Sequence, residues 1–134
     1  MTGGAHHLLL DTTVLIDVLR GRPAAARLRT LRSAAPVPHV SAVNVEEIWR
    51  GLRPGEERAA EQLVRALRLA PLGAEEGRVA GEWRREHASR GITLSQADCL
   101  VAAAAVGVNA RVATGNPKDF PMAGVVIEHW PVGR

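Results

Sequence analysis

The sequence is poor in aromatic residues, cysteine and long hydrophobic runs. Aromatic side chains make up 3% of its 134 residues, too few to favour nucleic-acid recognition by base stacking. Its one cysteine, Cys99, cannot form an internal disulfide, which agrees with a reducing compartment. The longest apolar run, 99–108, is shorter than the about 20 residues that a membrane-spanning helix needs. The residues before Asp11 lack the cationic and apolar regions of a secretory signal, so we expect a cytoplasmic protein.

Lysine is almost absent, and the positive charge comes from arginine. Sixteen of the seventeen basic residues are Arg, with Lys118 as the exception, and the net charge of +3 accompanies a pI near 10.4. Guanidinium groups stay charged and bind phosphate at two points, which makes nucleic acid a reasonable partner. Arginine-biased codon usage explains the same composition, so charge alone does not establish the partner.

What is present is typical of a globular α/β domain. A length of 134 residues fits one domain, and we find no linker or repeat, so we expect a single domain over 1–134. Apolar runs predict strands at 8–10, 37–43, 69–72, 111–114 and 125–130. Helices are expected at 13–20, 23–34, 45–50, 54–70, 75–90 and 96–106, the third capped by Asn44 and the last by Ser95. This alternation predicts a parallel sheet between two helical layers.

Acidic and amide side chains gather at one edge of the predicted sheet. Ligands collect beyond the carboxyl ends of parallel strands. Side chains that follow those ends, or lie at a helix N-terminus facing them, are Asp11, Glu46, Glu47, Asp98, Asn116 and Asp119. Such a cluster repels itself unless a cation is present. Oxygen ligands without a Cys or His pattern favour Mg²⁺ or Mn²⁺ over zinc, and these ions support phosphodiester hydrolysis.

Structural explanations remain open for most of these residues. The spacings Asn44 to Glu47 and Ser95 to Asp98 both fit a capping box, in which the acid supports only its own helix. Asp17 is expected on a solvated helix face, and Asp119 fits an Asx turn. Asp11 differs, since a strand-terminal acid has no structural task beyond capping the next helix.

Four blocks together resemble PIN-domain nucleases, and within them the VapC-type toxins of bacterial toxin–antitoxin pairs. The blocks are LLLDTTVLIDVLRG, SAVNVEEIWRGL, LSQADCLVAAAAV and VATGNPKDFP, in the family's order. The resemblance implies a three-layer α/β/α fold with a parallel sheet of about five strands. It also implies an Mg²⁺- or Mn²⁺-dependent endoribonuclease that acts on RNA and inhibits translation and growth. Such toxins are commonly homodimers and are silenced by a VapB-type antitoxin.

The resemblance carries over to individual residues. Asp11 matches the family's first acid, Glu47 the second and Asp98 the third. At the fourth place Asn116 stands where many relatives have an aspartate, and Asp119 is a nearby substitute. The polar positions that line the site in relatives are matched by Thr13 and Thr114.

These matches suggest a mechanism. Asp11, Asp98 and, directly or through water, Glu47 hold one metal ion, while Asn116 and Asp119 orient water or a second ion. Neighbouring phosphates would be held by arginines that follow helices in the first half of the chain. The candidates are Arg20, Arg22, Arg50 and Arg53.

Two other functions compete with this hypothesis. An aspartyl phosphatase would need a second Asp two residues after Asp11, where Thr13 stands, and a lysine near the phosphate, for which only Lys118 is available. A PIN-like module that binds RNA or protein with weakened or lost cleavage is favoured by Asn116. The three intact acids argue against it.

Overall fold

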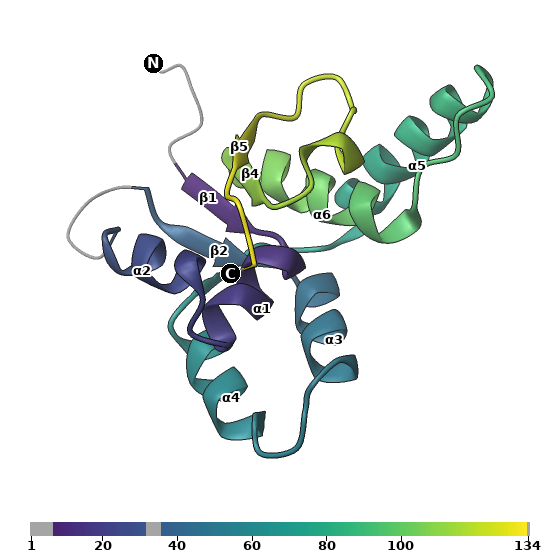
Figure 1. Cartoon of the computed structure of the whole chain (residues 1–134). Helices are drawn as coiled ribbons and strands as arrows, with labels where there is room; N and C mark the ends of the chain where they lie inside the picture. Colours follow the sequence, from purple (N-terminus) through teal and green to yellow (C-terminus); the bar gives the residue numbers. More distant parts are fainter. Residues whose placement is uncertain (1–6, 32–35, 134) are drawn as a thin grey trace.

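A five-stranded parallel sheet forms the centre of the molecule (Figure 1). The computed structural model describes residues 7–31 and 36–133. The strands are β1 (His7–Leu10), β2 (Pro38–Val40), β3 (Arg68–Leu69), β4 (Ala110–Thr114) and β5 (Ile127–His129), in the spatial order β3-β2-β1-β4-β5. β1 pairs with β4 over its whole length, from His7 opposite Ala110 to Leu10 opposite Ala113.

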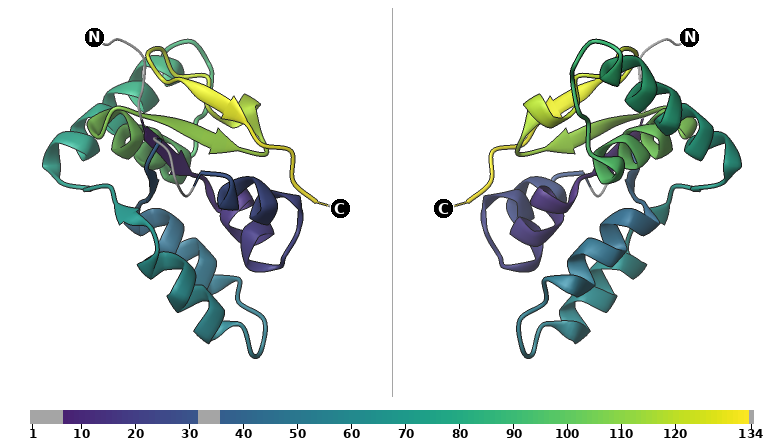
Figure 2. Two further views of the ribbon diagram at one scale, coloured as in Figure 1. Left: turned by 90° about the vertical axis from the view of Figure 1, so that its left-hand side faces the viewer. Right: turned by 90° about the vertical axis from the view of Figure 1, so that its right-hand side faces the viewer.

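Helices cover both faces of this sheet, as Figures 1 and 2 show. The helices are α1 (Thr12–Leu19), α2 (Pro23–Arg29), α3 (Ala42–Arg50), α4 (Glu57–Arg65), α5 (Ala74–Ala88) and α6 (Gln96–Gly107), with a 3-10 turn, η1 (Pro117–Asp119). Because side chains alternate along a strand, Leu9 packs into one core, with α5 and α6. Leu8 and Leu10 pack into the other, with residues of α1 to α4. The predicted α/β/α arrangement is confirmed.

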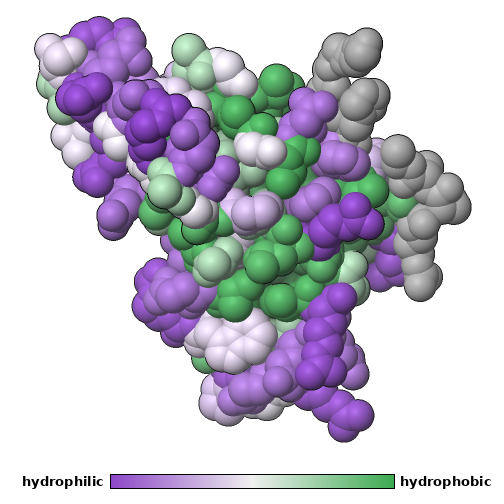
Figure 3. All heavy atoms as spheres, turned by 180° about the vertical axis from the view of Figure 1, so that it is seen from behind, coloured by the Kyte–Doolittle hydropathy of each residue, from purple (hydrophilic) through white to green (hydrophobic). Residues whose placement is uncertain are grey.

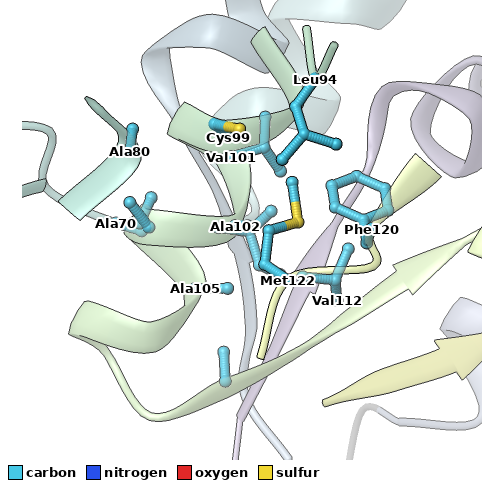
Figure 4. Packing of buried hydrophobic residues seen from close by; sticks show 14 residues of the cluster. Ala70, Ala80, Leu94, Cys99, Val101, Ala102, Ala105, Val112, Phe120 and Met122 are labelled. Atoms are coloured by element: carbon cyan, nitrogen blue, oxygen red, sulfur yellow. The ribbon is translucent and has the colours of Figure 1, made fainter. Parts of the chain in front are cut away.

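Small side chains let α6 lie close to the sheet. Ala102 and Ala105 of α6 belong to the same core as Val112 of β4, which also contains Phe120 and Met122 (Figure 4). This packing holds the helix that carries Asp98 against β4.

Several element bounds differ from the prediction. α3 begins at Ala42 because Ser41, and not Asn44, is its N-cap, and β2 therefore ends at Val40 instead of continuing to 43. α4 is shorter than 54–70, since the chain turns near Gly55 and becomes extended again at Arg68 to join the sheet. The predicted helix 23–34 ends at Arg29, and its positions 32–34 lie outside the described residues.

The order of the strands creates a crevice at the carboxyl edge. From β1 the chain proceeds to β2 and β3 on one side, and then crosses to β4 and β5 on the other. The connections after β1 and β4 lead away in different directions, which leaves space between them for a ligand. Residues that follow Leu10 and Thr114 flank this space. In the described ranges, no helix is long and apolar enough to cross a membrane.

Candidate active site

Asp11 lies at the carboxyl end of β1 and is buried, with 7% of its surface exposed. It occupies the N-cap position of α1, yet its side chain makes no capping hydrogen bond. Instead, Oδ2 accepts a hydrogen bond from Thr114 Oγ1 at 2.8 Å and a longer one from Thr13 Oγ1 at 3.3 Å. Asp11 therefore caps α1 through its backbone carbonyl, while its carboxylate is held by the end of β4.

Glu47 lies in the second turn of α3 and contacts α1. Its Oε1 accepts a hydrogen bond of 2.5 Å from Thr12 Oγ1. The capping box of α3 is formed by Ser41 and Asn44, so the alternative that Glu47 closes this box is wrong. The neighbouring Glu46 instead pairs with Arg50 at 3.0 Å on the exposed face of the helix. Of the two glutamates, Glu47 is the one held beside Asp11.

Asp98 lies in the first turn of α6 and is partly exposed. Its backbone N–H donates to Ser95 Oγ at 3.0 Å, which confirms the predicted N-cap. The N-cap fixes where the first turn begins, and so it fixes where Asp98 projects.

The loop after β4 completes the rim. The Asn116 N–H donates to Thr114 Oγ1 at 3.0 Å, and the Gly115 N–H donates to Thr13 Oγ1, also at 3.0 Å. The side chains of Asn116 and Asp119 are exposed. Thr13 and Thr114 thus join the starts of α1 and of the loop after β4 around Asp11.

The charges of the acids act on one another's pKa. The pKa of Asp11 lies above its ordinary value, chiefly because the carboxyl is buried, and the charges of Asp98 and Glu47 add to this shift, against the opposing hydrogen bonds from Thr114 and Thr12. The pKa of Asp98 is also raised, first by burial and further by Asp119 and Glu47, although its bond with Ser95 lowers it. Four acids from distant segments therefore influence one another.

The chemistry of this cluster suits a hard cation. Over residues 7–31 and 36–133, no three His, Cys, Asp or Glu side chains already surround a position for a metal ion. The acids nevertheless offer only oxygen ligands, and their repulsion is the kind that a divalent cation relieves.

Asp17 is not the solvated residue that the sequence suggested. It is 1% exposed, and its oxygens accept hydrogen bonds from the Ala24 N–H and the Gly133 N–H, both at 2.9 Å. Asp17 thus ties α1 to the start of α2 and to the C-terminal segment. Its role is structural.

The four candidate arginines have different surroundings. Arg20 pairs with Glu56 at 3.3 Å, and Arg50 is occupied by Glu46. The Arg53 N–H donates to the same Glu56. Arg22 lines a groove of about 320 Å³ together with Thr12 and Thr13, next to the acids. Of the four, Arg22 is the one that lines this groove.

Sequence reasoning missed the polar residues behind Glu47. Thr12, Asn44 and Ser41 form a continuous hydrogen-bonded chain that ends on the Glu47 carboxylate. Asn44 is 0% exposed, and an amide at 0% exposure needs partners for both its oxygen and its nitrogen. The only feature of Asn44 visible in the sequence was its position at the start of a predicted helix, and this position led to its interpretation as the N-cap.

Comparison with known proteins agrees with this geometry. A model of the PIN domain matches residues 8–123. The chain is 32% identical to Ribonuclease VapC19 of Mycobacterium tuberculosis over 116 residues, 85% of this chain and 92% of that protein. It is 33% identical to Ribonuclease VapC10 of the same organism, over 86% of each chain. The crystal structure of VapBC2 from Rickettsia felis, bound to a promoter DNA fragment, has the same fold, with a TM-score of 0.77 at 22% identity over 92% of this chain and 98% of that one. The chain therefore belongs to the PIN-domain family, and within it to the VapC proteins.

Proposed function

We propose that this chain is a divalent-metal-dependent endoribonuclease, the toxin of a VapBC-type toxin–antitoxin pair. The proposal is supported by the placement of the acids: Asp11 is held by Thr114 at the end of β4, and Glu47 is held by Thr12 beside Asp11. The charges of Glu47 and Asp98 both raise the pKa of Asp11. The names of its relatives VapC19 and VapC10 support ribonuclease activity.

The metal proposed for this site is Mg²⁺ or Mn²⁺. When bound, such an ion would polarise the scissile phosphate and activate water. Asp11 and Asp98 supply ligand oxygens, and Glu47 does so directly or through water. Asn116 and Asp119, at the exposed rim, orient water on the side of the open crevice.

Substrate binding depends on charge rather than on stacking. Arg22, in the groove beside Thr12 and Thr13, holds a phosphate next to the scissile one. Such contacts provide affinity that weakens with salt and little choice of sequence.

The proposed partners are a VapB-type antitoxin and a second copy of the chain. The name VapBC2 describes a toxin–antitoxin complex for the neighbour from Rickettsia felis. Figure 3 shows apolar side chains gathered in the middle of the face opposite to the view of Figure 1, a surface that suits either partner. Co-expression with the antitoxin should suppress cleavage and restore growth.

A cleavage assay tests the proposed activity. Purified protein should cut total cellular RNA with Mn²⁺ and stop when EDTA is added. Asp11→Asn and Asp98→Asn should each slow cleavage at least about 100-fold. Glu46→Gln, one residue from Glu47 on the exposed face, is the matched control and should keep the parent rate. Folded Asp11→Asn and Asp98→Asn variants that cleave like the parent would overturn the proposal.

Asn116 favours a second candidate, a PIN-like module that binds RNA without cutting it. An amide holds a metal-bound water but adds no negative charge at the fourth place of the site. If the missing negative charge at position 116 prevents catalysis, the parent protein binds RNA without cleaving it, and the Asn116→Asp variant gains Mn²⁺-dependent cleavage. If the ribonuclease proposal holds, the parent cleaves, and Asn116→Asp mainly lowers the Mn²⁺ concentration required.

A further inference from the structure

Glu47 is held by a chain of hydrogen bonds that starts in the buried N-terminus of α3. Asn44 Nδ2 donates to Thr12 Oγ1 at 3.1 Å, and Thr12 Oγ1 donates to Glu47 Oε1 at 2.5 Å. Asn44 and Ser41 are both 0% exposed. The Asn44 and Ser41 end of this chain is therefore closed to water, and the Thr12–Glu47 end is partly exposed.

The orientation of the Asn44 amide is fixed by its backbone neighbour. The Ser41 N–H can only donate, and it lies 3.1 Å from Asn44 Oδ1. Ser41 Oγ donates to the same oxygen at 2.7 Å. The oxygen of the amide must therefore face Ser41, which directs the NH₂ group toward Thr12.

This orientation in turn determines the proton of Thr12. A hydroxyl has one proton to donate. Because Thr12 Oγ1 accepts from Asn44 Nδ2, its own proton is directed to Glu47 Oε1, where a charge-assisted bond results. The capping box uses the backbone N–H and the side-chain oxygen of Asn44 but not its NH₂ group, so the contact to Thr12 is additional to the helix cap.

We propose that Asn44 is a positioning residue, which acts through Thr12 to hold the Glu47 carboxylate toward the metal site at Asp11 and Asp98. This inference rests on the proposed function, since it assigns Glu47 to metal binding. Without the Thr12 hydrogen bond, the partly exposed Glu47 side chain would sample several rotamers. Holding this side chain in one rotamer beforehand reduces the conformational entropy that is lost when the metal ion binds.

Calorimetric titration of the metal-free protein with Mn²⁺ tests the proposal without reliance on activity. Thr12→Val, which keeps the shape and removes the hydroxyl, should weaken Mn²⁺ binding about 10-fold, the lower end of the range for supporting residues of metal ligands. Thr12→Ser, which keeps the hydroxyl, should bind within about 2-fold of the parent. Asn44→Ala should weaken binding several-fold and also lower the Tm, because the Ser41 N–H loses its acceptor in the capping box.

The double variant separates positioning from stability. In the Thr12→Val background, Asn44→Ala should still lower the Tm but should not weaken Mn²⁺ binding further, because its route to Glu47 is already absent. Ala80→Gly in α5 is the control: it lowers the Tm by loosening a distant helix and should bind Mn²⁺ like the parent.

Two results would overturn the relay while the proposed function stands. One is a Thr12→Val variant that binds Mn²⁺ as tightly as the parent, in an experiment where Asp11→Asn abolishes Mn²⁺ binding. The other is an Asn44→Ala variant that weakens binding equally with and without the Thr12 hydroxyl. A parent that binds no Mn²⁺ would instead overturn the proposed function, and the relay with it.

Discussion

At the scale of single residues, the burial of Asp11 costs stability once its carboxyl is ionised. Its carboxyl is buried at the end of β1, near the charges of Asp98 and Glu47, and its pKa is raised mainly by burial. Hydrogen bonds from Thr114 and Thr13 hold it there. A residue kept in a position that disfavours its own ionised form is typical of a functional site.

This placement predicts how stability depends on pH in metal-free protein. The folded chain binds the Asp11 proton more tightly than the unfolded chain does, so protonation of Asp11 stabilises the fold. This stabilisation is fully present below 3.8, the ordinary pKa of the group, and is lost as the pH rises through the raised pKa of Asp11 in the folded chain. Asp11→Asn keeps an acceptor for Thr114 and removes the charge. Its Tm at pH 7 should exceed that of the parent by a few degrees, on the order of 4 °C per kcal/mol. The difference should shrink at pH 4. Calorimetric scans in EDTA measure both, and a lower Tm for Asp11→Asn at pH 7 would contradict the account.

Asp17, by contrast, supports the fold. Its oxygens are acceptors for the N–H groups of Ala24 and Gly133, so Asp17→Ala leaves both without a partner. We expect a loss of about 2–3 kcal/mol in the free energy of unfolding. Asp17→Asn, which retains one acceptor, should lose less. Urea unfolding measures these values, and a loss for Asp17→Ala no larger than that for Glu46→Gln would show that the bonds contribute little.

These two aspartates show how far a residue's role can be predicted from sequence. Asp11 could be assigned because its place after an apolar run is a local feature. The burial of Asp17 comes from α2 and from a segment 116 residues away, and a helical pattern contains no information about such contacts. The prediction for Asp17 was wrong for that reason.

At the scale of elements, the C-terminal segment packs against the loop that follows β4. A Cβ atom placed on Gly115 would lie 2.7 Å from Val132 Cγ2 and 3.4 Å from Thr13 Oγ1. The same glycine donates its N–H to Thr13. The close approach of Val132 therefore requires glycine at position 115.

A pair of substitutions tests this contact. Gly115→Ala should displace the C-terminal segment and cost about 1–3 kcal/mol, as overpacking does. Adding Val132→Ala should restore most of that loss, because it removes the methyl groups that the new Cβ meets. Urea unfolding of both single variants and the double variant measures the coupling free energy between positions 115 and 132. Losses that simply add would show that Val132 does not restrict position 115.

The start of α3 shows why element bounds are harder to predict than elements. Ser41 and Asn44 are both good N-caps, and local preference does not choose between them. In the structure both take part in one capping box, with Ser41 as the cap. With Ser41 in place of Asn44 as the N-cap, the helix starts three residues earlier than predicted, and Glu47 lies in its second turn, facing Thr12.

At the scale of the whole molecule, alternating strands and helices were enough to predict the α/β class. The strand order was not derivable from alternation, and the crevice between β1 and β4 follows from that order. The resemblance to PIN-domain nucleases predicts Asp11, Glu47 and Asp98 as site residues, and in the structure the charges of these residues affect one another. It did not identify Asn44, because a polar relay behind the site depends on the contact of α1 with α3.

The central claim is that these acids form a divalent-metal site. Anomalous diffraction from crystals of the parent protein grown with Mn²⁺ tests it most directly. The account predicts a single strong peak, or two neighbouring peaks, beyond the end of β1, in contact with carboxylate oxygens of Asp11 and Asp98 at about 2.0–2.3 Å. That peak should vanish in Asp11→Asn. No peak at this edge, or a peak held by other side chains while Asp11 keeps its bond to Thr114 alone, would contradict it.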